Sequence, residues 1–173
     1  MNAIVYTSNT GFTAQYAKLL GEKLGLPVYA LDEAKGELAT GTEILYLGWL
    51  MAGQVKGYKQ AAKRYKVAVV CGVGMGASGS QIEDIRKSNA IQEDTPVFTL
   101  QGGFELDKLH GPNKFMMNTM RHTVGKKLAG KPDKTAEEQD MLDLLQNGGS
   151  RVNEENLRPV LEWCKNAGAQ TQD

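Results

Sequence analysis

The chain repeats one pattern that few folds can accommodate: a short apolar run, a turn rich in glycine or polar residues, and a segment with helical spacing. The apolar runs cover residues 3–6, 27–31, 43–48, 66–71 and 96–101. Most of them lack the apolar–polar alternation of a half-exposed strand, which indicates strands buried on both faces. Strands that alternate with helices are joined by right-handed crossovers into a parallel sheet. We therefore expect an α/β protein with helices on both faces of a five-stranded parallel sheet.

Helical spacing marks the segments between these strands and most of the last third of the chain. The expected helices cover residues 13–24, 57–65, 80–88, 114–128, 135–146 and 153–166. The last helix has an apolar face that can return over the sheet, made by Leu157, Val160, Leu161 and Cys164. The two helices before it are additions to a doubly wound core. We expect one domain over 1–173, with the sheet and its loops in 1–110 and a helical part in 111–168.

The first apolar run leads directly into the polar turn that begins the first helix. Six residues make this turn: Ser8, Asn9, Thr10, Gly11, Phe12 and Thr13. The beginning of a helix leaves backbone N–H groups without intrahelical partners and carries the positive end of the helix dipole. The hydroxyl groups add donors, and Gly11 allows the backbone to approach a ligand closely. The turn predicts a phosphate site, although the same residue types also cap helices that bind no ligand.

Two further glycine-rich loops follow the third and fourth strands. The first contains Trp49, Leu50, Met51, Ala52 and Gly53, and the second contains Val73, Gly74, Met75 and Gly76. Ligands of open α/β sheets bind beyond the carboxyl ends of the strands, where the strand order reverses. We therefore expect these loops and the phosphate turn to face one crevice. Trp49 is either a ring that stacks on the ligand or a core aromatic residue, and Leu50 or Met51 could contact the ligand instead.

The segment Ser8-Asn-Thr-Gly-Phe-Thr13 resembles the phosphate loop of flavodoxin-like proteins, which holds the phosphate of FMN. The loop 49–53 resembles their flavin-stacking loop. The segments 48–53 and 101–109, with the helical last third, are similar to a bacterial flavodoxin-domain group akin to menaquinone-dependent protoporphyrinogen dehydrogenases. The resemblance implies a flavodoxin-like doubly wound sheet of order 2-1-3-4-5, FMN as the cofactor and an FMN-dependent oxidoreductase. The residues of 49–53 and 73–76 would then contact the flavin, and no side chain is expected to be catalytic.

The charge composition bears on the role of such a flavin. Lys plus Arg equals Asp plus Glu, at 20 each, so neither a basic nucleic-acid surface nor a strongly acidic docking face is expected. Carrier flavodoxins are usually strongly acidic, so the neutral chain favours an oxidoreductase. Its partner would be a quinone or porphyrinogen-like molecule, or a redox partner protein. A non-enzymatic electron carrier of the flavodoxin type is the alternative, and a cofactor-free interaction domain is less favoured.

Other kinds of site have weaker support. The segment Gly74 to Gly79 matches the GxGxxG dinucleotide fingerprint, but that fingerprint normally follows the first strand of a fold. His110 and His122 have no partner at metal-ligand or triad spacing, so no metal site is expected. His110 is a candidate general acid beside the crevice, and surface or capping roles are the alternative.

The cysteines and the methionines give two further expectations. Cys71 and Cys164 lie far apart in a strand and a helix, and we expect buried free thiols. The residues of 115–120 fall at helical spacing, which favours a core role for their methionines. No apolar run approaches the length of a membrane span, and no leader precedes the first strand, so a cytoplasmic location without an integral membrane segment is expected.

Overall fold

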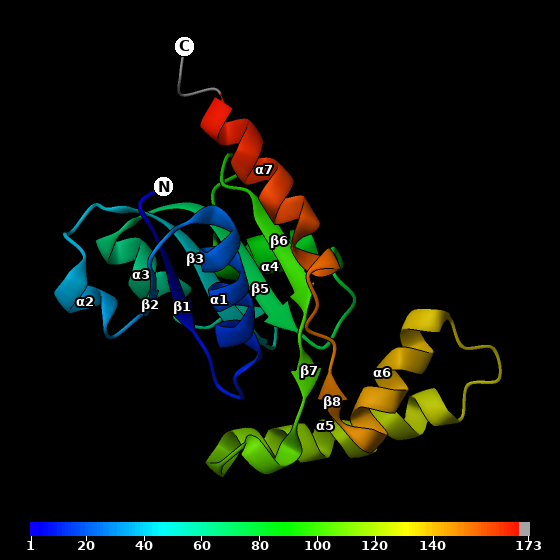
Figure 1. The fold of residues 1–173 in the computed structure, drawn as a ribbon. Helices are drawn as coiled ribbons and strands as arrows, with labels where there is room; N and C mark the ends of the chain where they lie inside the picture. The colour runs from blue at the N-terminus through cyan, green and yellow to red at the C-terminus, as the bar shows by residue number, and fades with distance from the viewer. Residues whose placement is uncertain (170–173) are drawn as a thin grey trace.

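A computed structural model describes residues 1–169 and has an α/β sheet covered by helices on both faces (Figure 1). The parallel strands are β1 (Ala3–Thr7), β2 (Val28–Ala30), β3 (Glu43–Met51), β5 (Lys66–Gly74) and β6 (Val97–Gln101). They pair in the order β2-β1-β3-β5-β6. This is the doubly wound, flavodoxin-like arrangement, which confirms the expected fold class and strand order.

The helices follow the expected pattern with shifted ends. They are α1 (Phe12–Leu24), α2 (Ala34–Glu37), α3 (Tyr58–Arg64), α4 (Ile82–Asn89), α5 (Gly111–Ala129), α6 (Ala136–Asn147) and α7 (Arg158–Ala169), with 3-10 turns η1 (Leu106–Lys108) and η2 (Glu155–Leu157). The expected last helix at 153–166 is thus a 3-10 turn followed by α7. Thr135 and Glu138 form the capping box that begins α6, as each side chain accepts a hydrogen bond from the backbone N–H of the other residue.

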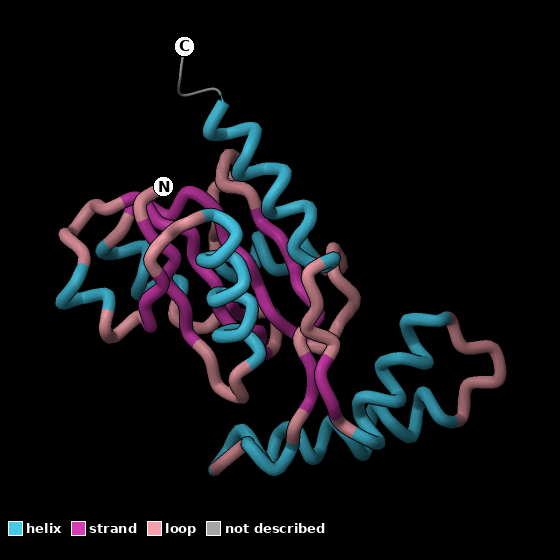
Figure 2. The backbone as a smooth tube through the Cα atoms, viewed as in Figure 1, coloured by secondary structure: helices cyan, strands magenta, loops and turns pink. Residues whose placement is uncertain are grey.

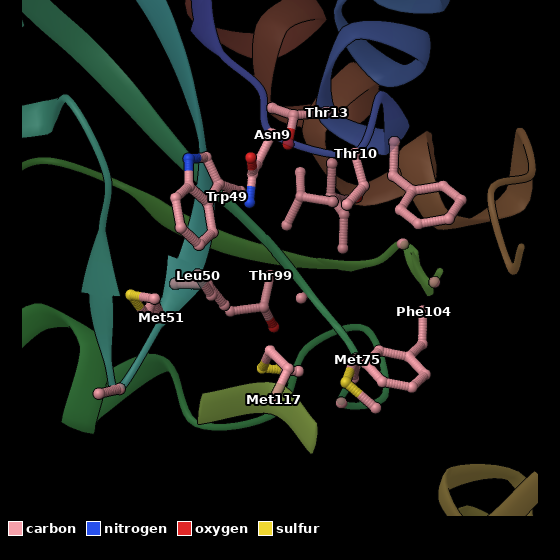
Figure 3. Close-up of a pocket in the computed structure, with 18 of the residues that line it drawn as sticks. Asn9, Thr10, Thr13, Trp49, Leu50, Met51, Met75, Thr99, Phe104 and Met117 are labelled. Atoms are coloured by element: carbon pink, nitrogen blue, oxygen red, sulfur yellow. The ribbon is translucent and has the colours of Figure 1, made fainter. Parts of the chain in front are cut away.

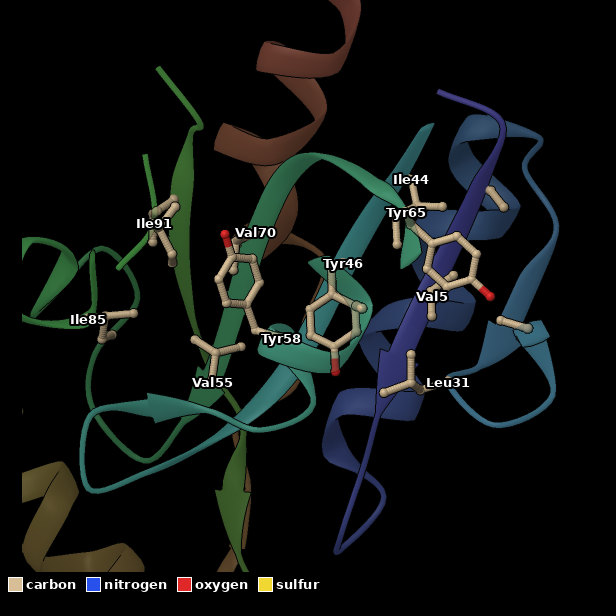
Figure 4. Packing of buried hydrophobic residues seen from close by; sticks show 14 residues of the cluster. Val5, Leu31, Ile44, Tyr46, Val55, Tyr58, Tyr65, Val70, Ile85 and Ile91 are labelled. Atoms are coloured by element: carbon tan, nitrogen blue, oxygen red, sulfur yellow. The ribbon is translucent and has the colours of Figure 1, made fainter. Parts of the chain in front are cut away.

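The central strands are buried on both faces, so the sheet separates two apolar clusters. Ala3, Val5, Ile44 and Tyr46 pack with residues of α2, α3 and α4 on one face (Figure 4). The alternate residues of the same strands pack on the other face against α1 and α7, with buried contributions from Leu157, Val160 and Cys164. A helical layer on each side is needed because both faces of these strands are apolar. Cys71 and Cys164 are buried free thiols within the second cluster, as expected.

A short two-stranded ribbon, not expected from the sequence, carries the helical part of the chain. The strand β6 ends at Gln101, as expected, and the chain then continues as β7 (Gly103–Phe104), which pairs antiparallel with β8 (Gly149–Ser150). Figure 2 shows this ribbon joining the sheet to a hairpin of α5 and α6. Phe104 packs with Leu109 and Leu144 in a small third cluster. The hairpin therefore lies beyond the carboxyl ends of the strands, and the chain returns through β8 to α7.

A buried polar junction holds the base of this ribbon. The hydroxyl of Tyr16, a wholly buried residue of α1, donates to the carbonyl of Gln101 at 2.5 Å. The Asn156 side-chain amide donates to the Tyr16 oxygen at 2.6 Å and to the Arg151 carbonyl at 3.0 Å. The Arg151 N–H donates to the carbonyl of Gly102 at 2.6 Å. The junction thus ties both strands of the ribbon to α1.

No helix within residues 1–169 is long and apolar enough to cross a membrane.

Leu157→Ala tests the packing of the C-terminal segment on the sheet. Leu157 is wholly buried in the cluster under α1 and α7, so the free energy of unfolding should fall by about 2–5 kcal/mol. Leu161→Ala is the matched control, since Leu161 is only partly buried there, and it should cost about 1 kcal/mol. Urea unfolding measures both values. Equal losses would contradict the packing described here.

Candidate functional site

One cavity of about 440 Å³ opens at the carboxyl ends of β1, β3 and β5. Members of all three predicted segments line it: Asn9, Thr10, Phe12, Thr13, Trp49, Leu50, Met51, Ala52, Gly53, Val73, Gly74, Met75 and Gly76. Ser8 and Gly11 are the members of the predicted set that do not line it. Figure 3 shows side chains from these separate segments around one space. The sequence thus predicted correctly that the three segments converge at this edge of the sheet.

The polar turn presents the beginning of α1 to the cavity. Gly11 is the residue before the helix, with φ of 97°, and its N–H donates to the Ser8 hydroxyl at 3.2 Å. No side chain caps α1, and its first turn contains no acidic residue. Ser8 accepts a hydrogen bond within the turn and does not cap the helix. The alternative in which the polar residues of this turn serve as a helix cap therefore does not apply. The positive end of α1 is left open to an anion beside Thr10 and Thr13.

A buried tyrosine holds the residue from which the polar turn begins. The Tyr46 hydroxyl donates to the Lys56 carbonyl at 2.7 Å. Because a phenol has a single proton, the Thr7 hydroxyl donates to the Tyr46 oxygen, also at 2.7 Å. Burial raises the pKa of Tyr46 to about 12, so the phenol stays protonated at neutral pH. The end of β1 and the residue after β4 are thereby both held to the middle of β3.

The predicted flavin-stacking loop is a β-hairpin. The strand expected at 43–48 continues to Met51, and β4 (Gln54–Val55) pairs back antiparallel, with Leu50 opposite Val55. Ala52 and Gly53 make the two-residue turn, with φ of 48° and 75°. A two-residue turn with positive φ at both positions matches the twist of a hairpin and favours glycine. The segment is therefore more rigid than the loop expected from its composition.

Asn89, a residue of α4 that sequence reasoning missed, anchors this hairpin. It is almost wholly buried, and its side-chain oxygen accepts a hydrogen bond from the Val55 N–H at 2.9 Å. Its amide nitrogen donates to the carbonyls of Gly53 and Ile85, both at 2.8 Å. The side chain is satisfied on both sides, so it fixes the hairpin relative to the sheet. An asparagine at the end of a helix gave no sequence signal for this contact.

The hairpin offers the cavity both an aromatic and an aliphatic wall. Trp49, Leu50 and Met51 all line the cavity, and the ammonium of Lys56 lies 5.7 Å from the centre of the Trp49 ring. Leu50 packs over β5, where a Cβ atom on Gly72 would lie 2.9 Å from its side chain. A glycine in this strand therefore makes room for the hairpin. The Trp49 ring borders the cavity next to Asn9 (Figure 3).

The loop after β5 forms the third wall and is tied to β6. The Thr99 hydroxyl donates to the Ser80 carbonyl at 2.9 Å, and the Ser78 hydroxyl accepts from the Gln101 N–H at 2.9 Å. The helix α4 begins only at Ile82, so the glycine pattern 74–79 leads into a loop and not directly into a helix. This differs from the context that the dinucleotide fingerprint requires.

The far side of the cavity is formed by the helical hairpin, which the sequence analysis did not assign to the site. The additional residues from β7 onward include Phe104, Glu105, Leu109, Met116, Met117, Met120 and Met141, and others come from the loop before α4, from α4, and from β6 and the two glycines after it: Ser80, Gln81, Ile85, Thr99, Leu100, Gly102 and Gly103. The methionines of α5 were expected in the core, and this was wrong. Met116 is 40% exposed, and Gly125 is the one buried residue of α5. The run of methionines was the available signal, because methionine adapts to irregular binding surfaces.

The cavity is nearly uncharged. Glu105 is the one acidic or basic residue that lines it, and it pairs with Lys108. His110 is exposed and does not line the cavity, which removes the geometric basis for a general-acid role. Within residues 1–169 there is no cluster of three His, Cys, Asp or Glu side chains that could hold a metal ion. The site therefore combines an anion-accepting end with an apolar chamber.

Ionic contacts outside the cavity hold the hairpin beside it. Arg151 reaches Asp140 at 2.7 Å and Asp143 at 2.6 Å. Asp140 also accepts from the side-chain amide of Gln101 at 2.6 Å. Hydrogen bonds from Asn147 and then Arg151 hold the pKa of the Asp143 carboxyl below its usual range. The last residue of β6 and the residue that follows β8 thus both bind α6.

No family model, curated protein or solved structure matches the chain. What the site does must therefore follow from its own geometry and chemistry. That geometry joins the open start of α1 to a chamber walled by the β3–β4 hairpin, the loop after β5 and the methionines of α5 and α6.

Asn89→Ala tests the anchoring of the β3–β4 hairpin. The change leaves the buried Val55 N–H without its partner, so the free energy of unfolding should fall by about 1–3 kcal/mol. Hydrogen exchange at the Val55 amide should become faster, and the free energy of opening that it measures should fall by a similar amount. Ser88→Ala is the control, because the contact from Gln54 uses the Ser88 backbone carbonyl, which the change preserves. A Val55 amide that stays equally protected in Asn89→Ala would refute the anchoring role.

Proposed function

We propose that the protein binds FMN in this cavity and acts as an FMN-dependent oxidoreductase of the flavodoxin-like family. The observation that carries the proposal is the convergence of three segments on one cavity at the switch point of a doubly wound sheet. Ligands of such sheets bind at that point. The protein would belong to the group akin to menaquinone-dependent protoporphyrinogen dehydrogenases, and it would lie in the cytoplasm.

The phosphate end of FMN fits the beginning of α1. The first-turn N–H groups have no side-chain cap, and the φ of 97° at Gly11 allows the chain to turn closely around an anion. A Cβ atom built on Gly11 would meet no other atom within 4 Å, so the turn has open space beside it. Thr10 and Thr13 line the cavity there. Hydroxyl and backbone donors together would hold a phosphate without any lysine or arginine.

The ring of FMN fits the remaining walls. Trp49, Leu50 and Met51 supply apolar and aromatic surface from one side, and Val73 to Gly76 supply backbone from another. An aromatic wall can stack on a flat ring, and glycines allow backbone groups to approach its edge. The bound flavin would supply the chemistry of electron and hydride transfer. The protein residues would orient the ring, exclude water from it and set its surroundings.

The methionine-lined side of the cavity favours an enzyme over an electron carrier. A carrier needs only an exposed flavin edge, whereas this cavity extends from the proposed flavin walls to Met116, Met117 and Met120 on α5. An uncharged, largely apolar chamber suits an apolar substrate, of the quinone or porphyrinogen-like kind. The chain as a whole is also neutral, whereas carriers that dock basic reductases are usually strongly acidic.

The visible spectrum of the purified full-length protein, with chemical identification of any released cofactor, tests the flavin proposal. We expect a flavin spectrum, or its appearance when FMN is added, with FMN as the released molecule. A colourless protein that fails to bind added FMN would overturn the proposal and favour a cofactor-free interaction domain.

Thr10→Val with Thr13→Val tests the phosphate assignment. Hydrogen bonds to a charged group contribute about 1.5–3 kcal/mol each, so the double variant should bind FMN about a hundredfold more weakly or worse. Riboflavin lacks the phosphate, and its affinity should change little. Thr123→Val is the control, since that hydroxyl bonds only to carbonyls of its own helix. Equal losses of FMN and riboflavin, measured by fluorescence titration, would contradict the assignment.

Met120→Gln tests the proposed substrate side of the cavity. We expect kcat/KM for a soluble apolar quinone to fall about tenfold, because a polar amide replaces apolar surface, while FMN affinity stays the same. Val124→Gln is the control on the same helix, since Val124 does not line the cavity. Unchanged kcat/KM in Met120→Gln would place the substrate elsewhere. A wild-type protein that holds FMN but turns over no quinone or porphyrinogen-like donor would favour the carrier.

A further inference from the structure

Two stretches of this neutral protein are basic: residues 56–66, with five lysines and arginines and no acidic residue, and the segment that contains α5. Residues 111–135, which cover α5 and the loop that follows it, contain six lysines and arginines and a single acidic residue, Asp133. The chain as a whole has equal numbers of acidic and basic residues, so the remainder carries a net negative charge. Both basic stretches would attract a negative surface, but among the described residues the exposed large hydrophobic side chains lie beside the second one.

Exposed apolar side chains lie on the same helix. The exposed large hydrophobic residues of the described part of the chain are Phe115, at 77% exposure, Met116, at 40%, and Val124, at 37%. All three belong to α5. A scattered exposed apolar residue needs no explanation, but a helix that gathers all of them beside its lysines does. Phe115 in particular exposes a whole aromatic ring to water.

Few contacts within residues 1–169 neutralise this helix. Glu138 of the neighbouring α6 pairs with Lys131 of the loop that follows α5, whereas Asp140 and Asp143 of α6 pair with Arg151, outside this segment. Within the part of the chain that the structure describes, no carboxylate pairs with Lys114, Lys126 or Lys127. Helical spacing places Phe115, Thr119, His122 and Lys126 along one exposed face.

The position of α5 makes this face the end of the molecule. Figure 1 shows the helix lying across the carboxyl ends of the strands, beyond the body of the sheet. Met116 and Met120 of this helix also line the cavity. A surface that received the face bearing Phe115 would therefore lie next to the cavity that α5 helps to enclose.

We infer that α5, with the loop 130–135, docks on the surface of an anionic phospholipid membrane. A bilayer interface offers phosphate groups for the lysines and an apolar layer for the Phe115 ring at the same time, and it requires no matching shape. An acidic protein would satisfy the lysines, but it would need an apolar recess placed for Phe115. Clusters of lysine and arginine near a membrane surface are attracted to anionic lipids, and the exposed Phe115 ring adds an apolar contact.

This inference does not depend on bound FMN, because the docking face is formed by residues outside the polar turn and the flavin walls. Membrane contact adds a consequence for the proposed substrate site. A molecule dissolved in the bilayer could reach the methionines of α5 without crossing water. Failure of the FMN proposal would leave the docking face unchanged, and the two can be tested separately.

Sedimentation of the full-length protein with unilamellar vesicles tests the inference. Vesicles of phosphatidylcholine mixed with phosphatidylglycerol should bind the protein, and vesicles of phosphatidylcholine alone should bind it far more weakly. Binding should fall as salt rises toward about 1 M, where the Debye length is only about 3 Å. Equal binding to both vesicles, or none to either, would overturn the inference, and the second result would leave α5 as a surface for an acidic protein.

Variants assign the binding to α5. Each basic residue near an anionic surface strengthens binding about fivefold, so Lys126→Glu with Lys127→Glu should weaken it at least about 25-fold. Phe115→Ser should weaken it about tenfold through the lost apolar contact. Lys59→Glu with Lys63→Glu makes the same charge change at exposed positions of α3 and should retain most of the binding. Losses that are equal in the α3 and α5 variants, with circular dichroism unchanged, would refute docking through α5.

Discussion

Parallel pairing of β1 with β3 is the constraint on which the rest of the structure depends. Five residue pairs, from Ala3 with Ile44 to Thr7 with Gly48, bring the two strands to the same edge of the sheet. Because both faces of this pair are apolar, helices must cover both, and each connection must cross over the sheet. The polar turn and the β3–β4 hairpin therefore emerge side by side, and the Tyr46 hydroxyl joins Thr7, at the end of β1, to the carbonyl of Lys56, which follows β4.

Two chemical environments meet at that edge, and their combination supports the proposed cofactor. The open start of α1 favours a negative charge, whereas the walls beyond it are aromatic, aliphatic and sulfur-containing, with Glu105 as the one acidic or basic lining residue. A ligand that satisfies both must carry an anionic group at one end and a flat apolar body at the other. FMN has this form, and a phosphate alone or an apolar molecule alone would satisfy only half of the cavity.

The sequence predicted what depends on local pattern and missed what depends on distant contacts. The apolar runs predicted the parallel strands, the resemblance to flavodoxin-like proteins implied their order, and the turn residues predicted the convergence of Thr10, Trp49 and Gly74 on one cavity. The β3–β4 hairpin was missed because its anchor, Asn89, is 34 residues from Val55. The ribbon of β7 and β8 was missed for a similar reason, since two-residue strands carry almost no pattern. The methionines of α5 have helical spacing in either a core or a cavity wall, so periodicity alone cannot separate the two environments.

The short ribbon divides the chain in an unexpected way. The N–H of Arg151 bonds to the carbonyl of Gly102, so the segment 103–150 leaves the sheet and returns to it at a single point. The described residues outside that segment form a complete doubly wound unit, in which η2 and α7 follow β6 directly in space. The helical hairpin is thus an insertion between the last strand and the last helix of a minimal scaffold. No strand of the main sheet lies within this segment, so its length can change without displacing that sheet, and the same sheet edge can be combined with different helical covers.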